Sequence, residues 1–491
     1  MTATNNGSAN YSSKINTREF SQLPLDIHTL ILHILSPLDI FRLRKTCKAM
    51  LDATSQRIVW LKALERMCND NTVYPYSFPT DKLTLLELEY AVMAPQKWEH
   101  LALSHQEEEM PSFATYTLQP QYHPNARRSH HQLERLYLIP GGRFLILVQR
   151  GYLTLWDLGY ISAIGAFRRT KIKPIAQIPC ACGSYAVHSS PDKSALRIFT
   201  ITRKCEHDGQ PMRYQFEVIE IFPWKYSPEF TTIATLSVIS EHNLDFTSIC
   251  GDRLTLVYGP ILKIWDFKSD EWATWNTSDS QRQIIMNNNH IALIGRHNIS
   301  VWDFPKLSKG AQMQATKAEP SIPLAPQRIL TFEENSIPVD DFSCSGLCDW
   351  YTDSPQPLWF DIVDELGILG ESLKLTRFEA DISDSTTFPL VPIRSFNLRV
   401  PTSDDPYLGA YRVCGSNIVI PRSTSLEISC HLGASSRSAN TRDHNTTLRL
   451  IQGVAWNHVS LCPVSGRLAY IAPESDDIEI IDFLPPLSDK H

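Results

Sequence analysis

The stretch LTLVYGPILKIWDF, residues 254–267, decides the fold class of most of this 491-residue chain. On either side of Gly259-Pro260, apolar residues recur at every second position, which is the period of a half-buried β-strand. Gly and Pro are common in the tight turns that join strands. The stretch therefore predicts an antiparallel β-hairpin whose second strand ends in Trp265-Asp266.

Hairpins of the same pattern recur along the chain, and two of the others also contain a Trp-Asp pair. They cover residues 144–157, 254–267, 290–304 and 467–483, with a weaker copy without Trp-Asp at 185–200. Further strand candidates are residues 358–362 and 447–451. A hairpin cannot bury both of its faces alone, so we expect these units to stack. The bulky side chains expected to fill the space between neighbours are Trp156, Trp265 and Trp302.

The repeated hairpins resemble the WD-repeat β-propeller family, in which each hairpin is half of a four-stranded blade. The separation of Trp265 and Trp302 in the sequence is close to the ~40 to 45 residues of one blade. The resemblance implies an all-β propeller over residues 106–491, with seven blades expected and six or eight as alternatives. The family's Gly-His dipeptide is absent from the sequence, which puts its histidine network in doubt. The alternative is a β-sandwich, which would be unusually large.

Before residue 70, the apolar residues recur every three or four positions, which is the period of an amphipathic helix. A first helix is predicted over residues 23–35, with Pro24 in its first turn, where a missing N–H costs little. Pro37 ends this helix, since its ring would clash with the preceding turn. A second helix is predicted over residues 38–55 and a third over residues 58–64. Three short helices bury too little surface to be stable alone, so another surface should cover their remaining apolar face.

Residues 21–68 resemble the F-box, the motif by which substrate receptors attach to a Skp-type adaptor in SCF ubiquitin ligases. The resemblance rests on the Leu-Pro opening, the Ser-Pro-Leu-Asp break at residues 36–39, the Thr-Cys-Lys triplet at 46–48 and Trp60, which closes the motif. One departure is Asp26, where the family more often has Glu. The adaptor-binding residues that the resemblance implies are Leu23, Pro24, Ile27, Ile31, Leu35, Pro37, Leu38, Leu43, Cys47 and Lys48. The alternative is a helical cap whose apolar stripes are part of the protein's own core.

The remaining segments complete the predicted domain division. Residues 1–20 are polar and predict a disordered N-terminal tail. Residues 69–105 predict a linker with one helix, which is capped by Thr80 or Asp81 and stopped by Pro95. A rigid helix here would hold the propeller at a fixed angle to the F-box. The predicted fold class is therefore α+β and multidomain, with a small all-α unit of three helices followed by an all-β propeller.

Composition limits the possible partners and compartments. The chain has 46 Lys and Arg against 53 Asp and Glu, a net charge of −7 that does not favour a nucleic-acid partner. No run approaches the ~18 apolar residues of a membrane span, and the first 20 residues contain no apolar signal segment. Eleven cysteines, an odd number without a disulfide framework, are typical of reduced thiols. We expect a cytoplasmic or nuclear protein without a membrane or nucleic-acid partner.

Few residues are arranged for catalysis or metal binding. The chain lacks the Gly-x-Ser-x-Gly elbow, the Walker A loop and the His-Glu-x-x-His helix. Neither Cys180 and Cys182 nor Cys344 and Cys348 have a second pair at zinc spacing, so packed thiols are favoured and no metal or cofactor is expected. A cluster of carboxylates could act as general acid and base, and a basic loop could hold a phosphate. For all three such clusters, the favoured interpretation is a solvated loop or a charged strand edge. The three clusters concerned are Glu333, Glu334, Asp340 and Asp341; Arg168, Arg169, Lys171 and Lys173; and His123, Arg127, Arg128, His130 and His131.

Together these features predict a non-catalytic substrate receptor of an SCF-type ubiquitin ligase. In this combination the chain is similar to fungal F-box proteins with a C-terminal WD-repeat-like propeller. The resemblance implies that the F-box binds a Skp-type adaptor, and through it cullin and RING subunits, while the propeller binds an unknown target protein. One alternative is a propeller scaffold that uses its helical N-terminus for another partner and marks nothing for degradation. Another is a propeller hydrolase that depends on an inward-facing carboxylate.

Overall fold

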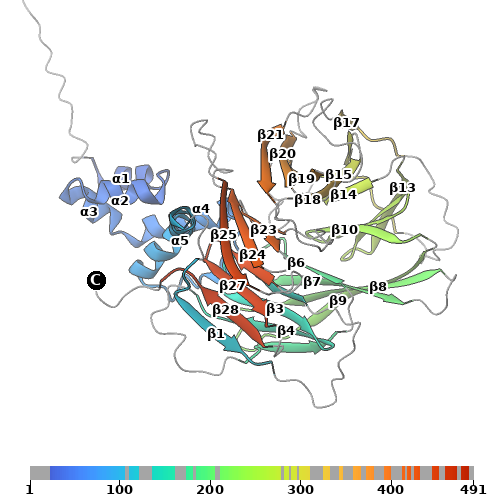
Figure 1. Ribbon diagram of the computed structural model, residues 1–491, viewed down its shortest axis with the longest axis horizontal. Coiled ribbons are helices and arrows are strands. Elements are labelled where there is room, and N and C mark those ends of the chain that lie inside the picture. The colour runs from blue at the N-terminus through green and yellow to red at the C-terminus, as the bar shows by residue number, and fades with distance from the viewer. Residues whose placement is uncertain are drawn as a thin grey trace, which may run out of the picture.

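The fold is a helical unit followed by a series of small antiparallel sheets, seen in the computed structural model of the chain (Figure 1). The described residues are 23–105, 110–120, 135–160, 173–180, 184–204, 211–240, 242–277, 281–286, 289–295, 298–309, 324–331, 342–346, 358–366, 372–380, 392–399, 412–414, 417–421, 425–431, 445–452, 459–472 and 477–485. The tail predicted over residues 1–20 lies outside these ranges.

Five α-helices and one 3-10 turn make up the helical unit of the described chain. They are α1 (Leu25–Leu32), α2 (Pro37–Arg44), α3 (Lys48–Thr54), α4 (Arg57–Asp70), η2 (Pro75–Ser77) and α5 (Leu85–Ser104). Ser36 caps α2, because its hydroxyl accepts a hydrogen bond from Asp39 N at 3.2 Å. Pro37 then occupies the first turn of α2, where its missing N–H has no intrahelical partner to lose.

The helices over residues 25–70 number four, where three were expected. The helix predicted over residues 38–55 is interrupted at Cys47, whose extended backbone (φ −159°, ψ 166°) separates α2 from α3. Thr46 N donates to Leu43 O at 2.9 Å, which closes α2 with a tight turn. This break lets α3 contact both α1 and α2 instead of continuing the line of α2.

The linker helix also differs from its prediction at both ends. It begins after Thr84, not after Thr80 or Asp81, and Thr84 and Glu87 form a reciprocal capping box. It also continues through Pro95 to Ser104, although an interior proline costs about 3 kcal/mol. Burial of side chains beyond the proline, such as Trp98 at 2% exposure, offsets this cost.

The strands form seven four-stranded antiparallel sheets within the described residues. The first three sheets are β2 (Arg135–Leu138), β3 (Phe144–Gln149), β4 (Tyr152–Asp157) and β5 (Ala176–Pro179); β6 (Ser184–Ser189), β7 (Leu196–Lys204), β8 (Met212–Ile221) and β9 (Thr231–Ser240); and β10 (Leu244–Cys250), β11 (Arg253–Tyr258), β12 (Ile261–Asp266) and β13 (Glu271–Asn276). Each of the hairpins predicted from the sequence over these residues is present as a pair of neighbouring strands.

The later sheets follow the same order, with one exception in the last. They are β14 (Gln281–Met286), β15 (His290–Gly295), β16 (Asn298–Asp303) and β17 (Arg328–Thr331); β18 (Phe342–Gly346), β19 (Leu358–Leu366), β20 (Ser372–Ala380) and β21 (Pro392–Arg399); β22 (Arg412–Cys414), β23 (Asn417–Pro421), β24 (Ser425–His431) and β25 (Asn445–Gln452); and β1 (Ala114–Leu118) with β28 (Ile478–Asp482), β27 (Arg467–Ile471) and β26 (Val459–Cys462).

These sheets are the blades of a β-propeller. The first strands of neighbouring blades contact one another, as β6 with β10, β10 with β14 and β14 with β18, which places them on the inner side. Strand β2 of the first blade contacts β26 of the last. Strand β1 completes the last blade by pairing with β28, so the two ends of the propeller sequence are joined in one sheet. The fold expectation of a helical unit and a seven-bladed all-β propeller is confirmed.

The tryptophans of the Trp-Asp pairs fill the spaces between blades, as predicted. Trp265 packs with residues of the β6–β9 blade, and Trp302 packs with residues of the β10–β13 blade. Trp156 belongs to a hydrophobic cluster that includes Leu118 and Ile480 of the last blade. The same cluster continues into the helices, where it includes Trp60. The helical unit therefore has no separate core of its own but shares one with the junction of the first and last blades.

Candidate functional site

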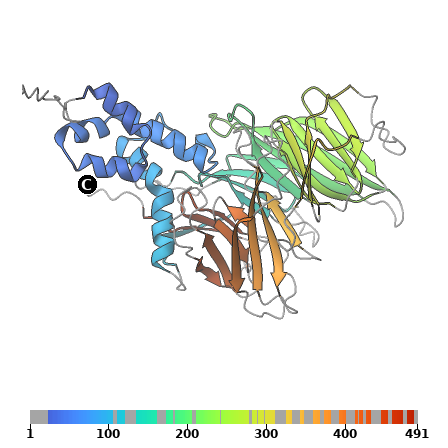
Figure 2. The ribbon, with the colours of Figure 1, turned by 90° about the horizontal axis from the view of Figure 1, so that it is seen from above.

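The candidate site is the part of the helical unit farthest from the propeller. Figure 1 shows α1, α2 and α3 side by side there, and Figure 2 shows α5 between these helices and the blades. The inward side of the unit is fully packed, with Leu32, Ile40 and Met50 at 1% exposure or less. Trp60 is also completely buried, and its indole N–H donates to Thr54 O at 2.8 Å. The closing tryptophan of the motif is thus a core residue and leaves the outer side to other side chains.

Helices α1, α2 and α3 and the turn that follows α1 expose large apolar side chains to solvent. The two most exposed are Ile34 at 77% and Leu30 at 62%, four residues apart in the sequence. We call the following six residues the exposed apolar surface: Leu25, Ile27, Leu30, Ile34, Leu38 and Leu51. Such a concentration of exposed aliphatic groups on three short helices is typical of a protein-binding site.

The ten residues predicted to bind an adaptor all remain at least partly accessible. Five are exposed, namely Pro24, Ile27, Leu38, Cys47 and Lys48. Five are half-buried, namely Leu23, Ile31, Leu35, Pro37 and Leu43. Among the second group, Leu35 and Leu43 pack against the helical core, and Pro37 begins α2. The structure therefore exposes five of the ten predicted residues and leaves the other five half-buried, two of them in contact with the core.

The sequence-based site omitted four of the most exposed residues, Leu25, Leu30, Ile34 and Leu51. The buried residues of α1 are His28 and Leu32, which are four residues apart, and the helical period alone does not distinguish this side of the helix from the others. Leu30 is exposed on another side of α1, and Ile34 is exposed in the turn that follows α1. An apolar stripe wider than one helix face is the sign that only part of it belongs to the core.

A polar cluster at the start of α2 borders the exposed apolar surface. The hydroxyl of Ser36 donates to Asp39 Oδ2 at 2.7 Å, and Arg42 Nη1 donates to Asp39 Oδ1 at 2.9 Å. These two interactions, the Ser36 hydrogen bond first and the Arg42 guanidinium second, lower the pKa of the Asp39 carboxyl. Asp39 is therefore a carboxylate at neutral pH, held at the positive end of the α2 dipole.

Arg44 connects helices α2, α3 and α4 to the linker helix α5. Its Nη1 and Nη2 both reach the carboxylate of Glu89 in α5, at 3.0 and 2.5 Å. Its Nε and Nη2 also donate to the side chain and carbonyl of Thr54, and the guanidinium lies over the rings of Phe41 and Trp60. One partly buried side chain thus joins α2, α3, α4 and α5, with its charge fully compensated.

Helix α5 is in turn attached to the last blade of the propeller. Trp98 packs against Phe483, with 5.7 Å between ring centroids, and the hydroxyl of Tyr90 donates to Pro485 O. Burial raises the pKa of Tyr90, so this phenol keeps its proton at neutral pH. Tyr90 directly follows Glu89, the partner of Arg44. Adjacent residues of α5 therefore contact the helical unit and the propeller.

A second attachment joins residues 74–77 to the first two blades. Tyr74 OH donates to Ser194 O at 3.0 Å, and Arg143 Nη1 donates to Tyr76 O at 3.0 Å. The backbone approaches closely at Gly141, which has φ +105° and would place a Cβ 2.4 Å from that of Ser77. Only glycine fits such a contact without a shift of the backbone. With α5, this contact holds the helical unit to the propeller at two separate places.

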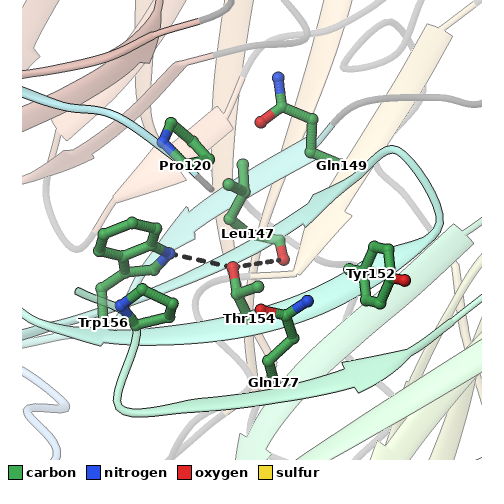
Figure 3. Close-up of a pocket in the computed structure, with 8 residues that line it drawn as sticks. Pro120, Leu147, Gln149, Tyr152, Thr154, Trp156 and Gln177 are labelled. Atoms are coloured by element: carbon green, nitrogen blue, oxygen red, sulfur yellow. Dashed lines mark hydrogen bonds between the residues drawn. The ribbon is translucent and has the colours of Figure 1, made fainter. Parts of the chain in front are cut away.

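A small hollow lies between the first blade and residue 120 (Figure 3). Its floor includes Trp156, whose indole N–H donates to Thr154 Oγ1 at 2.9 Å, and Thr154 Oγ1 donates to Leu147 O. These polar atoms are occupied within the sheet and are not directed at a ligand. The hollow therefore belongs to the junction between the first blade and the segment that follows β1.

Several sequence-based candidates lie outside the described residues. They are the carboxylates Glu333, Glu334, Asp340 and Asp341, the basic residues Arg168, Arg169 and Lys171, Cys182 and Cys348, and the histidine loop His123, Arg127, Arg128, His130 and His131. Among the residues that the structure does describe, no group of three or more His, Cys, Asp or Glu side chains is placed to hold a metal ion. Within the same part of the chain, every helix is too short or too polar to span a membrane.

Comparison with known proteins matches residues 20–62 to the F-box domain family. Comparison with curated protein sequences found no match. Similar solved structures include the N-terminal domain of Nup159, which is 12% identical with a TM-score of 0.33, the alignment covering 77% of this chain and 98% of that one. The WD40 domain of SCAP from fission yeast is 10% identical with a TM-score of 0.33, covering 72% and 84%. The Cps50 (Swd1) β-propeller domain of Myceliophteria thermophila is 11% identical with a TM-score of 0.26, covering 72% and 97%.

The match at residues 20–62 coincides with α1, α2, α3 and the beginning of α4. It therefore includes all six residues of the exposed apolar surface. The assignment of the remaining chain rests on its own sheet topology, in which seven four-stranded blades are joined by β1. F-box domains in general bind Skp1-type adaptors, and F-box proteins with a propeller generally serve as substrate adaptors in SCF-like complexes. The chain is an F-box protein with a C-terminal β-propeller.

Proposed function

We propose that this chain is the substrate-recognition subunit of an SCF-type ubiquitin ligase. The exposed apolar surface and the ten residues predicted from the sequence would bind a Skp-type adaptor, which recruits the cullin and RING subunits. The propeller would bind a target protein in the cytoplasm or nucleus. The receptor itself is non-catalytic, because its contribution is to raise the concentration of the target near the ubiquitin carrier.

The observation that carries this proposal is the exposed apolar surface within the F-box match. Exposure of six large aliphatic side chains to water is unfavourable. A partner that fully buries one such side chain would stabilise the complex by about 1.5–3 kcal/mol. The core beneath them is already complete, with Trp60, Leu32 and Ile40 buried. A foreign subunit is therefore the surface that can cover them.

The two attachments of the F-box to the propeller support the second half of the proposal. Arg44 and Glu89 link the F-box to α5, and Tyr90 and Trp98 link α5 to the last blade. A rigid connection of this kind would keep a bound target at a fixed distance from the adaptor. The fixed distance would raise the effective concentration of the target near the ubiquitin carrier, because a bound target does not have to find the carrier by diffusion.

Adaptor binding is tested with purified full-length chain and a purified Skp-type adaptor. The double variant Leu30→Glu with Ile34→Glu places charges at the two most exposed apolar positions. We expect its affinity for the adaptor to fall at least about 30-fold, as expected for residues at the centre of an interface. The matched control is Lys62→Glu in α4, another exposed helical position, whose side chain contacts only Glu65 among the described ion pairs.

The melting temperature of each variant shows whether the change is local. Leu30 and Ile34 are outside the core, so the propeller should unfold at the same temperature in all three proteins. If the native chain does not bind the adaptor, or if the double variant binds as tightly as the control, the receptor proposal fails. A propeller scaffold with another helical partner would then be favoured.

A further inference from the structure

Each blade has an outer strand whose far edge pairs with no other strand in the described part of the chain. Such an edge offers N–H and C=O groups to any extended peptide, so proteins usually keep it short, charged, proline-bearing or covered. Most outer strands here have such a protection. Strand β5 has four residues and ends in Pro179, β13 is covered where Trp272 pairs with Ser308, β17 has four residues, β1 has five, and β21 and β25 contain arginine.

Strand β9 is the exception. It has ten residues, Thr231–Ser240, with no charged residue and no proline. A bulge at Ile233 interrupts the pairing with β8, because Ile219 is opposite Thr232 and Val218 is opposite Ala234. The bulge protects only the beginning of the strand. From Ala234 to Ser240 the strand is regularly paired with β8, and no described strand pairs with its other edge.

A rigid aromatic surface lies directly before β9. In the loop between β8 and β9, Trp224 is 45% exposed and stacks on Tyr76, with 5.4 Å between centroids and 14° between ring planes. Its indole N–H donates to Ser194 O at 2.7 Å, so the ring is fixed. Tyr226, two residues further, is fully exposed. Exposed aromatic side chains that are already ordered lose little entropy on binding and are frequent anchors of protein interfaces.

Positive charge marks the opposite end of β9. Arg213 lies opposite Ile239 of β9, and Lys204 lies opposite Arg213 on the next strand. Arg203, Lys204 and Arg213 are all exposed. The aromatic surface therefore precedes Thr231, and the basic group lies at the Ser240 end of the sheet, with Arg213 one strand and Lys204 two strands inward from the open edge. This polarity favours one direction for an added strand.

We propose that the edge Ala234–Ser240 binds an extended segment of the target protein as an additional antiparallel strand. This inference rests on the proposed function, since it names the place where the target is held. In an antiparallel strand, the amino-terminal end of the segment lies beside the basic group, so acidic residues are favoured there. The following residues alternate, with apolar side chains on the side of Leu236 and Val238 and polar ones on the side of Thr235 and Ser237. The segment contains no proline, which would remove a donor to the edge.

The test uses the full chain and a synthetic peptide, Glu-Glu-Val-Thr-Val-Thr-Val-Thr-Val. We expect saturating peptide to slow hydrogen exchange of backbone amides in residues 234–240. A second peptide carries N-methyl groups on two amides that would face β9, which removes two hydrogen bonds and leaves every side chain in place. We expect it to bind about 30-fold more weakly. A third peptide with Lys-Lys in place of Glu-Glu should also bind more weakly.

Protein variants provide a second test. Neighbouring residues of a strand direct their backbone N–H groups to opposite edges. Of the two variants Leu236→Pro and Ser237→Pro, one therefore removes an N–H group that faces the open edge, while the hydrogen bonds to β8 remain. The variant that keeps the native melting temperature should lose at least about tenfold in peptide affinity relative to Ser237→Thr. The peptide comparison decides the question even if both proline variants fail to fold.

Three results would overturn the proposal: no protection of residues 234–240, equal binding of the N-methylated peptide, or equal binding of the Lys-Lys peptide. The adaptor is absent from these measurements, so they are independent of adaptor binding. A chain that binds the adaptor but shows no protection at β9 would keep the receptor function and exclude this site for the target.

Discussion

Arg467 and Asp482 lie directly opposite each other in neighbouring strands β27 and β28 and are joined by two hydrogen bonds. Nε donates to Oδ1 at 2.6 Å, and Nη2 donates to Oδ2 at 2.9 Å. Both side chains are buried, and Nη1 also donates to Gly142 O and Gly159 O at 2.6 and 3.0 Å. This one ion pair therefore ties the last blade to the loops of the first.

A basic residue also faces an acidic one in four other blades, and Arg143 donates to both carboxylate oxygens of Asp157 as Arg467 does to Asp482. In each case a basic residue near the start of one strand faces an acidic residue near the end of the next strand. In three of these pairs, the acidic residue is the Asp of a Trp-Asp pair. The pairs are Arg143 with Asp157, Arg197 with Glu220, Arg253 with Asp266, and His290 with Asp303. The sequence lacks the Gly-His dipeptide of WD repeats, and here the partner of the acid is a basic residue in the neighbouring strand. It follows that the Asp of each Trp-Asp pair retains a structural partner without that dipeptide.

The Arg467–Asp482 pair should be far more important for stability than the longer and less buried Arg253–Asp266 pair. We expect Asp482→Asn to lower the free energy of unfolding by about 3–5 kcal/mol, because it leaves the buried guanidinium without a compensating charge. The matched control is Asp266→Asn, whose partner Arg253 is 35% exposed and 3.7 Å away, with an expected loss below about 1 kcal/mol. Urea unfolding followed by tryptophan fluorescence measures both. Equal losses in the two variants would contradict this explanation.

The β part of the fold was predictable because its signal is local. Residues 253–258 and 261–266 alternate with period two around a Gly-Pro turn, and the structure pairs them in that register. The Arg–Asp pairs were not predicted, since they depend on which residues of two strands lie opposite each other. Register of this kind is a relation between strands and cannot be obtained from the period of one strand.

The helical part was predicted less well, and for two physical reasons. The break at Cys47 carries no Pro or Gly, so a continuous helix over residues 38–55 satisfied every local rule. Pro95 carries a strong local stop signal, which packing overrides by burying residues beyond it in the junction with the propeller. In the candidate site, helical spacing identified which residues of α1 are apolar. It did not show that Leu32 faces the core while Ile34 faces solvent, because that depends on where the other helices pack.

Arg44 and Glu89 should determine the orientation of the F-box relative to the propeller. We expect Glu89→Gln to broaden the distance distribution between spin labels at Cys47 and at a cysteine placed at the exposed Ser269, because the pair is the charged link between α2 and α5. Pulsed electron paramagnetic resonance measures this distribution. The same change should lower the free energy of unfolding by about 2–4 kcal/mol, since it leaves Arg44 partly buried without its partner.

The control for this prediction is Glu65→Gln, which breaks the exposed Lys62–Glu65 pair within α4. An exposed pair one turn apart stabilises a helix by at most a few tenths of a kcal/mol, so neither the distance distribution nor the stability should change noticeably. An unchanged distribution in Glu89→Gln would show that the contacts of Tyr90 and Trp98 with the propeller are sufficient for the orientation.

Cys47 offers a direct chemical measurement of adaptor binding. It is exposed among the residues predicted to contact the adaptor, whereas Cys68, Cys180, Cys250 and Cys462 are buried. Burial, with a smaller contribution from Glu65, raises the pKa of the Cys68 thiol to about 12, so at pH 8 this thiol keeps its proton and is a poor nucleophile.

We expect iodoacetamide to alkylate Cys47 in the free chain, with the site identified by peptide mass spectrometry, and saturating adaptor to protect it. Cys68 should remain unmodified in both states, which controls for unfolding. The variant Leu30→Glu with Ile34→Glu should lose the protection while its free Cys47 reacts at the native rate, because Cys47 itself is unchanged. If adaptor bound to the native chain leaves Cys47 fully reactive, the adaptor occupies another surface than the one formed by α1, α2 and α3.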